Sequence, residues 1–449
     1  MTQDIVCTLV DLLEVFRPAL TAPGLSNLVV VLAGWVRTSG AHAVTEALVV
    51  TGVSGRRHHE AYHRFFSRGT WSPDELGRLL FEFLLRALPA TMVIRIVLDD
   101  TVAPKKGPHV FGIGTHLDAT RSTKRHRVFI FGHCWVVLAV LVRVPFSSRS
   151  WALPILLRLY RNEKECLKKG VVHRKKTELA REMLDVFRAW VGERRVELAA
   201  DAAYCNDTVT RGLPPSVVIF GAMRPDAVLT ALPTAAERKH TGRRRVRGKV
   251  LPKPEALARD ESVPWQHTGA MLYGRRQTIH FKTLCGQWYR ACGEGLLRIV
   301  VVRVDSGRIP LRVFFSTDPT VSVRALLETY AGRWSIEVCF RELKQLLGFS
   351  DSSARKREAV ERIAPFVAIT YSTLVTWAAR GADRAAWAAL PVRPWYTHKR
   401  GLSFADVLRA AQRALATLDV LDPHSRSANL HETTPSPKRP SGAALRIPA

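Results

Sequence analysis

The sequence predicts a mixed α/β fold with helical regions at both ends of the chain. Between about residues 91 and 350, short apolar runs rich in Val and Ile alternate with segments of helical periodicity. Before and after this part, apolar residues recur at spacings of three and four. The chain has 449 residues, of which 47% are hydrophobic, so it can bury a sizeable core. Its length exceeds the roughly 250–300 residues at which single cores usually divide, so at least two domains are expected.

The first 90 residues read as a series of helices. Apolar residues three and four positions apart define one helix around Leu9–Phe16 and another around Leu76–Phe83. The segment Ser72-Pro73-Asp74-Glu75 begins the second helix, because Ser caps a helix, Pro suits its first turn and Glu suits its third position.

The middle of the chain changes to strand patterns. The β-branched run Val93–Leu98 ends on Asp99 and Asp100, and the shorter run Val196–Ala200 ends on Asp201. Further strands are expected over residues 127–131, 134–141, 217–220, 297–304 and 311–315, with a basic helix over 173–191. Strands that alternate with helices in this way indicate a mixed sheet with flanking helices.

The last third of the chain is mainly helical. A long helix is expected over 322–347, and further helical turns over 351–416. Beyond Leu421 the sequence is rich in Pro, Ser, His and Arg, and we expect this tail to be disordered.

The chain is strongly basic. Lys and Arg total 67 against 39 for Asp and Glu, which gives a formal net charge of +28 and a pI near 10.5. A field of this sign attracts polyanions, and neutralising phosphates releases their counterions. Ribosomal proteins and basic membrane-surface proteins share this property, so the charge alone indicates an acidic partner and no more.

The cysteines and the hydropathy pattern indicate a cytoplasmic protein. The seven cysteines are scattered and include no CxxC pair, which argues against a disulfide framework and a zinc ribbon. The longest apolar stretches, Leu28–Val36 and Cys134–Val142, fall short of the roughly 20 residues that a membrane-spanning helix needs. The first residues lack the basic segment of a signal peptide. No membrane partner is expected.

Four polar residues lie on one face of the long predicted helix. Tyr330, Arg333, Glu337 and Lys344 fall within a sector of roughly 60° when each residue turns the helix by about 100°. A solvated face with an Arg333–Glu337 ion pair would also account for this stripe.

Two further acids favour a catalytic reading of that face. Asp100 and Asp201 each follow an apolar strand, although a lone Asp at such a place is commonly a turn former. Together with Glu337 they supply three carboxylates, which can hold two divalent ions about 3.5–4 Å apart. Oxygen ligands favour Mg²⁺ or Mn²⁺. Arg333 and Lys344 would then hold a phosphate backbone near the two ions.

The spacing Tyr330-x2-Arg333-x3-Glu337-x6-Lys344 is similar to the Tyr-Arg-Glu-Lys signature of bacterial insertion-sequence DDE transposases. The segments 98–101 and 200–204 resemble those around that family's first and second catalytic Asp, so the resemblance covers roughly residues 60–350.

The resemblance implies a ribonuclease-H-like core that hydrolyses the ends of its own element and joins the 3′-hydroxyl ends to target DNA without a covalent protein–DNA intermediate. The expected partners are double-stranded DNA, as terminal inverted repeats and target, and a second copy of the chain in a homodimer on the two ends. The expected location is the bacterial cytoplasm, in association with the nucleoid.

The same resemblance accounts for the 136 residues that separate Asp201 from Glu337. In that family a β-rich insertion domain occupies this gap, and residues 229–295 have the right place, with a basic run and two aromatic segments. Trp288 or Trp265 could stack on a flipped base, although ordinary core packing is the favoured explanation for each. The candidate DNA contacts are Tyr330, Arg333, Arg341, Lys344, Lys105, Lys106, Arg243, Arg244, Arg245 and Trp288.

These inferences divide the chain into six parts: a helical N-terminal DNA-binding region (1–90), a first part of the catalytic core (91–228), a β-rich insertion (229–295), a second part of the core (296–350), a helical C-terminal region (351–418) and a disordered tail (419–449).

The first acid is ambiguous, because Asp99 and Asp100 are neighbours. Successive strand residues point to opposite faces, so only one of them can readily reach the ions. The family pattern places the catalytic Asp directly before Thr, which favours Asp100. Asp99 would then either contact the metal-binding residues without binding an ion itself or lie on the surface.

Two other functions compete with this interpretation. His59, Glu60 and His63 fit the HExxH pattern of zinc metallopeptidases, and Glu82 has the spacing of a third zinc ligand. The flanking arginines instead suggest a basic helix that faces DNA. A non-catalytic DNA-binding protein derived from a transposase is the second rival, and the three retained acids argue against it.

Overall fold

The computed structural model describes residues 8–86, 89, 91–107, 109–118, 121–123, 125–234, 237, 242, 244–303, 311–381, 395, 401–416 and 419–421. These fall into two compact units. Unit 1 comprises Met1–Pro89, Asp100–Arg174 and Val338–Pro448, and unit 2 comprises Ala90–Asp99 and Lys175–Glu337.

Helices make up much of unit 1. They are α1 (Leu9–Leu13), η1 (Glu14–Ala19), α2 (Ala22–Arg37), α3 (Val44–Val50), α4 (Glu60–Ser67), α5 (Pro73–Leu85), α6 (Glu163–Lys168), α13 (Arg357–Ala379) and α15 (Phe404–Ala416). Thr8 begins α1 in a capping box with Asp11, and the Thr21 side chain caps α2. The Ser72 cap expected for α5 has the extended backbone of a cap but no side-chain hydrogen bond.

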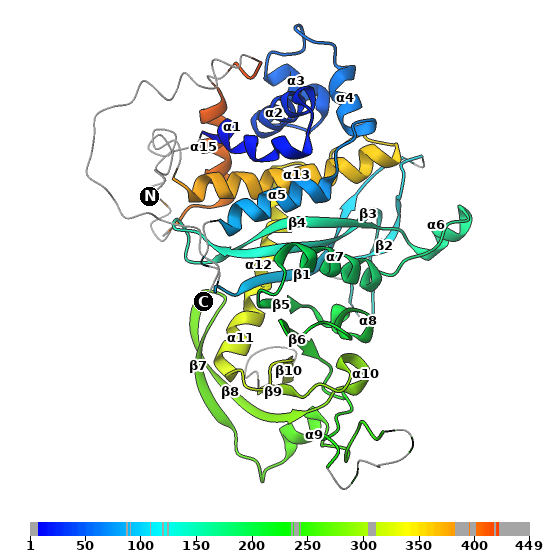
Figure 1. Cartoon of the computed structure of the whole chain (residues 1–449), viewed down its shortest axis with the longest axis vertical. Helices are drawn as coiled ribbons and strands as arrows, with labels where there is room; N and C mark the ends of the chain where they lie inside the picture. The colour runs from blue at the N-terminus through cyan, green and yellow to red at the C-terminus, as the bar shows by residue number, and fades with distance from the viewer. Residues whose placement is uncertain are drawn as a thin grey trace, which may run out of the picture. The chain divides into compact units, whose positions relative to one another are not determined.

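The strands of unit 1 are β2 (Gly114–Leu117), β3 (Phe129–Arg143) and β4 (Ser150–Tyr160), and β3 pairs antiparallel with both of the others. Helix α13 packs against β4, with α5 beside it (Figure 1). Two strands expected at 127–131 and 134–141 are a single strand, β3. Strand β4 was not expected at all, because its mostly buried side chains give no alternation between apolar and polar residues.

Unit 2 is built on one twisted mixed sheet in the strand order β1-β5-β6-β10-β9-β8-β7. The strands are β1 (Ile94–Pro104), β5 (Val196–Ala200), β6 (Val217–Met223), β10 (Leu311–Ser316), β9 (Leu297–Arg303), β8 (Arg275–Gly286) and β7 (Gln266–Leu272). Strands β1, β5 and β6 run parallel, and the remaining pairs are antiparallel. Strand β1 continues beyond Asp99 into unit 1.

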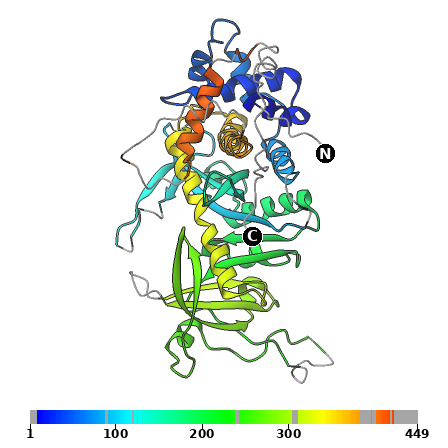
Figure 2. The same ribbon diagram turned by 90° about the vertical axis from the view of Figure 1, so that its left-hand side faces the viewer.

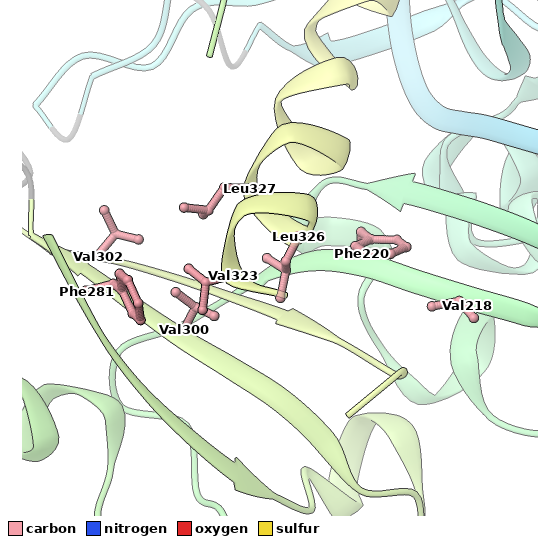
Figure 3. Packing of buried hydrophobic residues seen from close by; sticks show 8 residues of the cluster. All are labelled: Val218, Phe220, Phe281, Val300, Val302, Val323, Leu326 and Leu327. Atoms are coloured by element: carbon pink, nitrogen blue, oxygen red, sulfur yellow. The ribbon is translucent and has the colours of Figure 1, made fainter. Parts of the chain in front are cut away.

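Helices accompany the sheet of unit 2: α7 (Lys176–Val191), η2 (Ala202–Tyr204), α8 (Asp207–Thr210), α9 (Pro254–Arg259), α10 (Tyr289–Cys292), α11 (Val323–Gly332) and the start of α12 (Trp334–Leu346). Figure 3 shows Val323, Leu326 and Leu327 of α11 among buried side chains of three strands, namely Val218, Phe220, Phe281, Val300 and Val302. This packing fixes α11 on the sheet, and with it the residues that follow α11.

The predicted mixed α/β fold, with helical regions at both ends of the chain, is confirmed. Strands β7 and β8 lie in the predicted insertion, and β8 pairs with β9, so these strands extend the sheet of unit 2. The predicted tail beyond Leu421 lies outside the described residues. In the part of the chain that the structure describes, no helix is long and apolar enough to cross a membrane.

Candidate active site

Asp99 and Asp201 directly follow paired residues of two adjacent strands, β1 and β5. The parallel register pairs Val97 with Ala199 and Leu98 with Ala200, so the next residues in line are Asp99 and Asp201. Paired residues of adjacent strands project to the same face, and the strands are about 4.8 Å apart. The sheet therefore presents these two carboxyl groups side by side.

Arg333 joins Asp99 to the third predicted acid. Its Nη1 donates to Asp99 Oδ2 at 2.7 Å, and its Nη2 donates to Glu337 Oε1 at 2.8 Å. The side chains of Arg333 and Asp99 are only 14% and 17% exposed, whereas that of Glu337 is 34% exposed. Asp99, Arg333 and Glu337 thus form one largely shielded chain of charge-assisted hydrogen bonds.

The acids keep this arginine fully charged. Burial lowers the pKa of the Arg333 guanidinium, but the nearby negative charges of Asp99, Glu337 and Asp201, together with Tyr330, outweigh burial and raise the pKa above its ordinary value. The Arg333 Nε is buried and has no hydrogen-bond partner within the described protein. Such an orphaned donor costs free energy unless an acceptor from outside the chain reaches it.

Tyr330 completes this side of the site. Its ring packs against Phe314 with centroids 4.7 Å apart, and the Arg333 guanidinium lies 5.9 Å from the Tyr330 centroid. Burial, opposed by the Arg333 charge and assisted by the Asp201 charge, raises the pKa of Tyr330 to about 12. Tyr330 is therefore a neutral phenol at ordinary pH.

The predicted long helix is divided at Arg333. Helix α11 ends at Gly332 and α12 begins at Trp334, and Figure 2 shows one running directly into the other. The Arg333 N–H donates to the Tyr330 carbonyl, three residues back, which tightens this turn. Because Arg333 keeps helical backbone angles, the structure still brings Tyr330, Arg333 and Glu337 together as the spacing predicts.

Among the described residues, no group of three or more His, Cys, Asp or Glu side chains is placed to hold a metal ion. In the candidate site the charge of Arg333 already lies between Asp99 and Glu337, so a cation occupies the place where carboxylates converge. The donor chemistry, carboxylate oxygens alone, is the kind that Mg²⁺ and Mn²⁺ prefer.

Asp100, which the sequence favoured as the first acid, lies in different surroundings. It belongs to unit 1, where the Cys134 thiol donates to its Oδ2 at 3.4 Å. Lys344 is a further electrostatic neighbour, and burial lowers the pKa of its ammonium against the charges of Asp118, Cys134 and Asp100. Because strand residues alternate, Asp100 points to the face of β1 opposite to Asp99.

The remaining candidate phosphate contacts of unit 1 are Lys105, Lys106 and Arg341, and they differ in whether the side chain is already hydrogen-bonded within the protein or is exposed. Lys105 Nζ donates to the Ser352 carbonyl at 2.6 Å, and burial lowers its pKa to about 8, so this side chain is already engaged. Lys106 and Arg341 are exposed.

The candidate DNA contacts of the predicted insertion lie in unit 2. Trp288 makes an edge-to-face contact with Phe315 at 5.5 Å, which is the core packing that competes with base stacking. Arg244 is exposed, and Arg245 pairs with Glu237 at 3.5 Å. Arg243 lies outside the described residues. The alternative aromatic, Trp265, lies against the cations of Lys282 and Arg303, 4.9 Å and 5.3 Å from its ring centroid.

The HExxH segment is not arranged as a zinc site. Glu60 pairs with Arg64 at 2.9 Å, and the His59 and His63 rings meet edge to face at 5.8 Å. Glu82, the spacing-based third ligand, is held by Arg78. The acids that a peptidase would use are therefore both paired with arginine.

Sequence reasoning gave Asp99 only a supporting role, and it did not find the link between Asp99 and Arg333. Asp99 and Arg333 are 234 positions apart, so no local spacing connects them. The parallel register of β1 and β5 was the available signal, because it pairs the residue after Leu98 with the residue after Ala200.

Comparison with known proteins identifies the family of the chain. One family model, described as "DDE superfamily endonuclease", matches residues 16–280, and another, described as "Archaeal putative transposase ISC1217", matches residues 294–379. Among solved structures, the chain is similar to a cryo-EM structure of the piggyBac transposase synaptic complex with hairpin DNA, with a TM-score of 0.43 and 8% sequence identity. That match covers 94% of this chain and 78% of the other. No curated protein matches the sequence.

Proposed function

We propose that this chain, which belongs to the DDE superfamily of endonucleases, is a DNA transposase whose active site lies on unit 2. The observation that carries the proposal is the bridge that Arg333 makes between Asp99 and Glu337, beside Asp201. Membership of the family predicts endonuclease activity. In this cluster several acids surround the guanidinium of Arg333, a group that commonly binds phosphate.

We assign the first carboxylate to Asp99 rather than to Asp100. Asp99 shares its sheet face with Asp201 and is held by the same guanidinium as Glu337. Asp100 points to the other face of β1 and contacts Cys134. Asp99, Asp201 and Glu337 are then the three acids of the site.

Two Mg²⁺ or Mn²⁺ ions fit this donor set. Asp99, Asp201 and Glu337 would hold them, and the ions would supply activation of the attacking oxygen and stabilisation of the leaving oxygen. Without ions, the Arg333 guanidinium bridges Asp99 and Glu337 and offsets their negative charge, so it stands in for part of the metal charge. Carboxylates without any cation would repel each other in this partly buried place.

Arg333 and Tyr330 have roles toward DNA. With ions bound to the acids, the Arg333 guanidinium would be available to a phosphate oxygen, and its Nε, which has no hydrogen-bond partner in the protein, would supply one of the donors. Tyr330 stays protonated, so its hydroxyl can donate to the DNA backbone.

The reaction has two stages, hydrolysis at the element ends and transfer of those ends to target DNA. At each element end, water attacks phosphorus on both strands in turn. Each attack forms a new P–O bond, breaks the P–O3′ bond and passes a proton of the water to O3′, so the element is released with a free 3′-hydroxyl. That hydroxyl then attacks a phosphodiester of the target, so that one P–O bond is exchanged for another without an external energy source. We propose a cut-and-paste reaction by a homodimer bound to the terminal inverted repeats.

The test uses the full chain and linear DNA that carries both ends of the element found beside its gene. With Mg²⁺ or Mn²⁺ we expect free 3′-hydroxyl ends at the element boundary and joined products with a target plasmid. With a chelator we expect neither product, because three carboxylates alone cannot activate water. Cleavage that proceeds equally well in chelator, or no cleavage with either ion, would refute the proposal.

A further inference from the structure

The β2–β3 hairpin of unit 1 exposes a row of large apolar side chains. Leu117, Phe129 and Phe131 are 48%, 58% and 46% exposed. The antiparallel register places Leu117 opposite Phe129, and Phe131 opposite Thr115. Opposed residues, and residues two apart along a strand, project to the same face of the ribbon. The three apolar side chains therefore form one patch, here named the hairpin patch.

The connection between the two strands carries positive charge next to the hairpin patch. Arg121, Arg125 and Arg127 are all exposed. The acid Asp118 is only 13% exposed and lies 3.5 Å from Arg121. The sequence contains no further Asp or Glu until Glu163, so no nearby acid along the chain offsets these arginines.

Hydrogen bonds link several of the residues of this connection that the structure describes, namely 118, 121–123 and 125–128. The Asp118 N–H donates to the Val128 carbonyl at 2.9 Å, and the Thr123 N–H donates to the His126 carbonyl at 2.7 Å. The Val128 N–H donates to the Ser122 hydroxyl at 3.0 Å. These bonds order the described residues around Arg121, Arg125 and Arg127, which reduces the entropy lost when a partner binds.

The charge selects the class of partner. Exposed apolar patches of this kind usually mark an interaction surface. A second copy of the same hairpin would bring three more arginines against these three, and like charges in contact are unfavourable. A polyanionic partner would instead attract the three arginines. A two-stranded ribbon also fits the major groove of duplex DNA, where apolar side chains contact thymine methyl groups.

We propose that the β2–β3 hairpin is a DNA-binding ribbon, in which Arg121, Arg125 and Arg127 hold phosphates while the hairpin patch packs against the wall of a groove of duplex DNA. The inference rests on the proposed function only in taking DNA as the ligand. It assigns to unit 1 a contact outside the catalytic residues of unit 2.

The three arginines and the hairpin patch should affect DNA binding differently, because only the arginines change how the affinity depends on salt. Each phosphate contact steepens the dependence of log K on log salt by about 0.9. The triple variant Arg121→Gln/Arg125→Gln/Arg127→Gln should therefore flatten that slope by about two to three. The double variant Phe129→Ser/Phe131→Ser should weaken binding by about tenfold and leave the slope unchanged, because apolar contacts release no counterions.

The assay measures duplex binding by the full chain in chelator with Glu337→Gln as background, so that it does not depend on cleavage. Arg143→Gln, at the far exposed end of β3, and Val49→Ser, on the exposed side of α3, are matched controls and should bind as the background does. Failure of the cleavage test above leaves this readout intact, so the two proposals can fail separately.

Two outcomes would overturn the inference. One is that the triple and double variants bind DNA with the affinity and salt slope of the controls. The other is that Phe129→Ser/Phe131→Ser turns a DNA-free dimer into a monomer in light scattering without changing DNA affinity, which would make the hairpin patch a contact between copies of the chain.

Discussion

Replacing Asp99 with Asn should reduce Mg²⁺-dependent cleavage of element ends by about 10³-fold or more, a loss of about 4 kcal/mol of transition-state stabilisation. Asn keeps the shape of the side chain but removes the charge that an ion needs. It also removes one acid from the pair that Arg333 bridges. The measurement is single-turnover cleavage of end-bearing DNA at saturating protein.

The neighbouring acid is the matched control. Asp100→Asn should keep cleavage within about tenfold of the unaltered chain, because Asp100 contacts Cys134 on the other face of β1. Both variants change the same residue type at adjacent positions of one strand. Loss of cleavage in Asp100→Asn with retention in Asp99→Asn would return the first carboxylate to Asp100.

Removing the bridging cation should destabilise the site when ions are absent. In Arg333→Gln, Asp99 and Glu337 lose their shared partner, and Asp99 is left with its charge largely shielded from water. We expect a loss of about 2 kcal/mol of unfolding free energy in chelator, because a shielded charge without its partner keeps its desolvation cost. Millimolar Mg²⁺ should restore more stability to this variant than to the unaltered chain, because the ion takes over the role of the guanidinium.

Thermal unfolding with and without Mg²⁺ measures this effect. Arg357→Gln is the control, since Arg357 pairs with Glu361 at the same i,i+4 spacing but with a side chain that is 65% exposed. Exposed pairs contribute about 0–1 kcal/mol, so this variant should unfold as the unaltered chain does and respond to Mg²⁺ equally. An Arg333→Gln variant that is as stable as this control in chelator would show that the bridge does not contribute to the free energy of unfolding.

The helical face of the site could be predicted from sequence because helix spacing is local. Tyr330, Arg333 and Glu337 are three and four residues apart, and the break at Arg333 does not move them off a common face. The choice between Asp99 and Asp100 could not be made in this way. The preceding residues Val97 and Leu98 are both fully buried, so neither face of β1 is marked as polar by alternation.

Long-range pairing supports the proposed choice of Asp99, whereas the sequence favoured Asp100. The register of β1 against β5 sets Asp99 beside Asp201, and a contact across 234 positions sets Asp99 beside Arg333. Strand β4 escaped prediction for a related reason, because it is buried along most of its length and pairs with β3 over ten residue pairs. The pairing of β4 with β3 therefore determines its structure more than its own pattern of apolar and polar residues does.

The central claim is that Asp99, Asp201 and Glu337 hold divalent ions, and Fe²⁺ in place of Mg²⁺ tests it most directly. Fe²⁺ with ascorbate and peroxide cuts the protein backbone next to where the ion is bound, and mass spectrometry maps the cuts. We expect cuts near residues 99, 201 and 337 that Mg²⁺ suppresses and that Asp201→Asn abolishes. Cuts confined to the His59–His63 segment, or cuts near the three acids that persist in Asp201→Asn, would contradict the account.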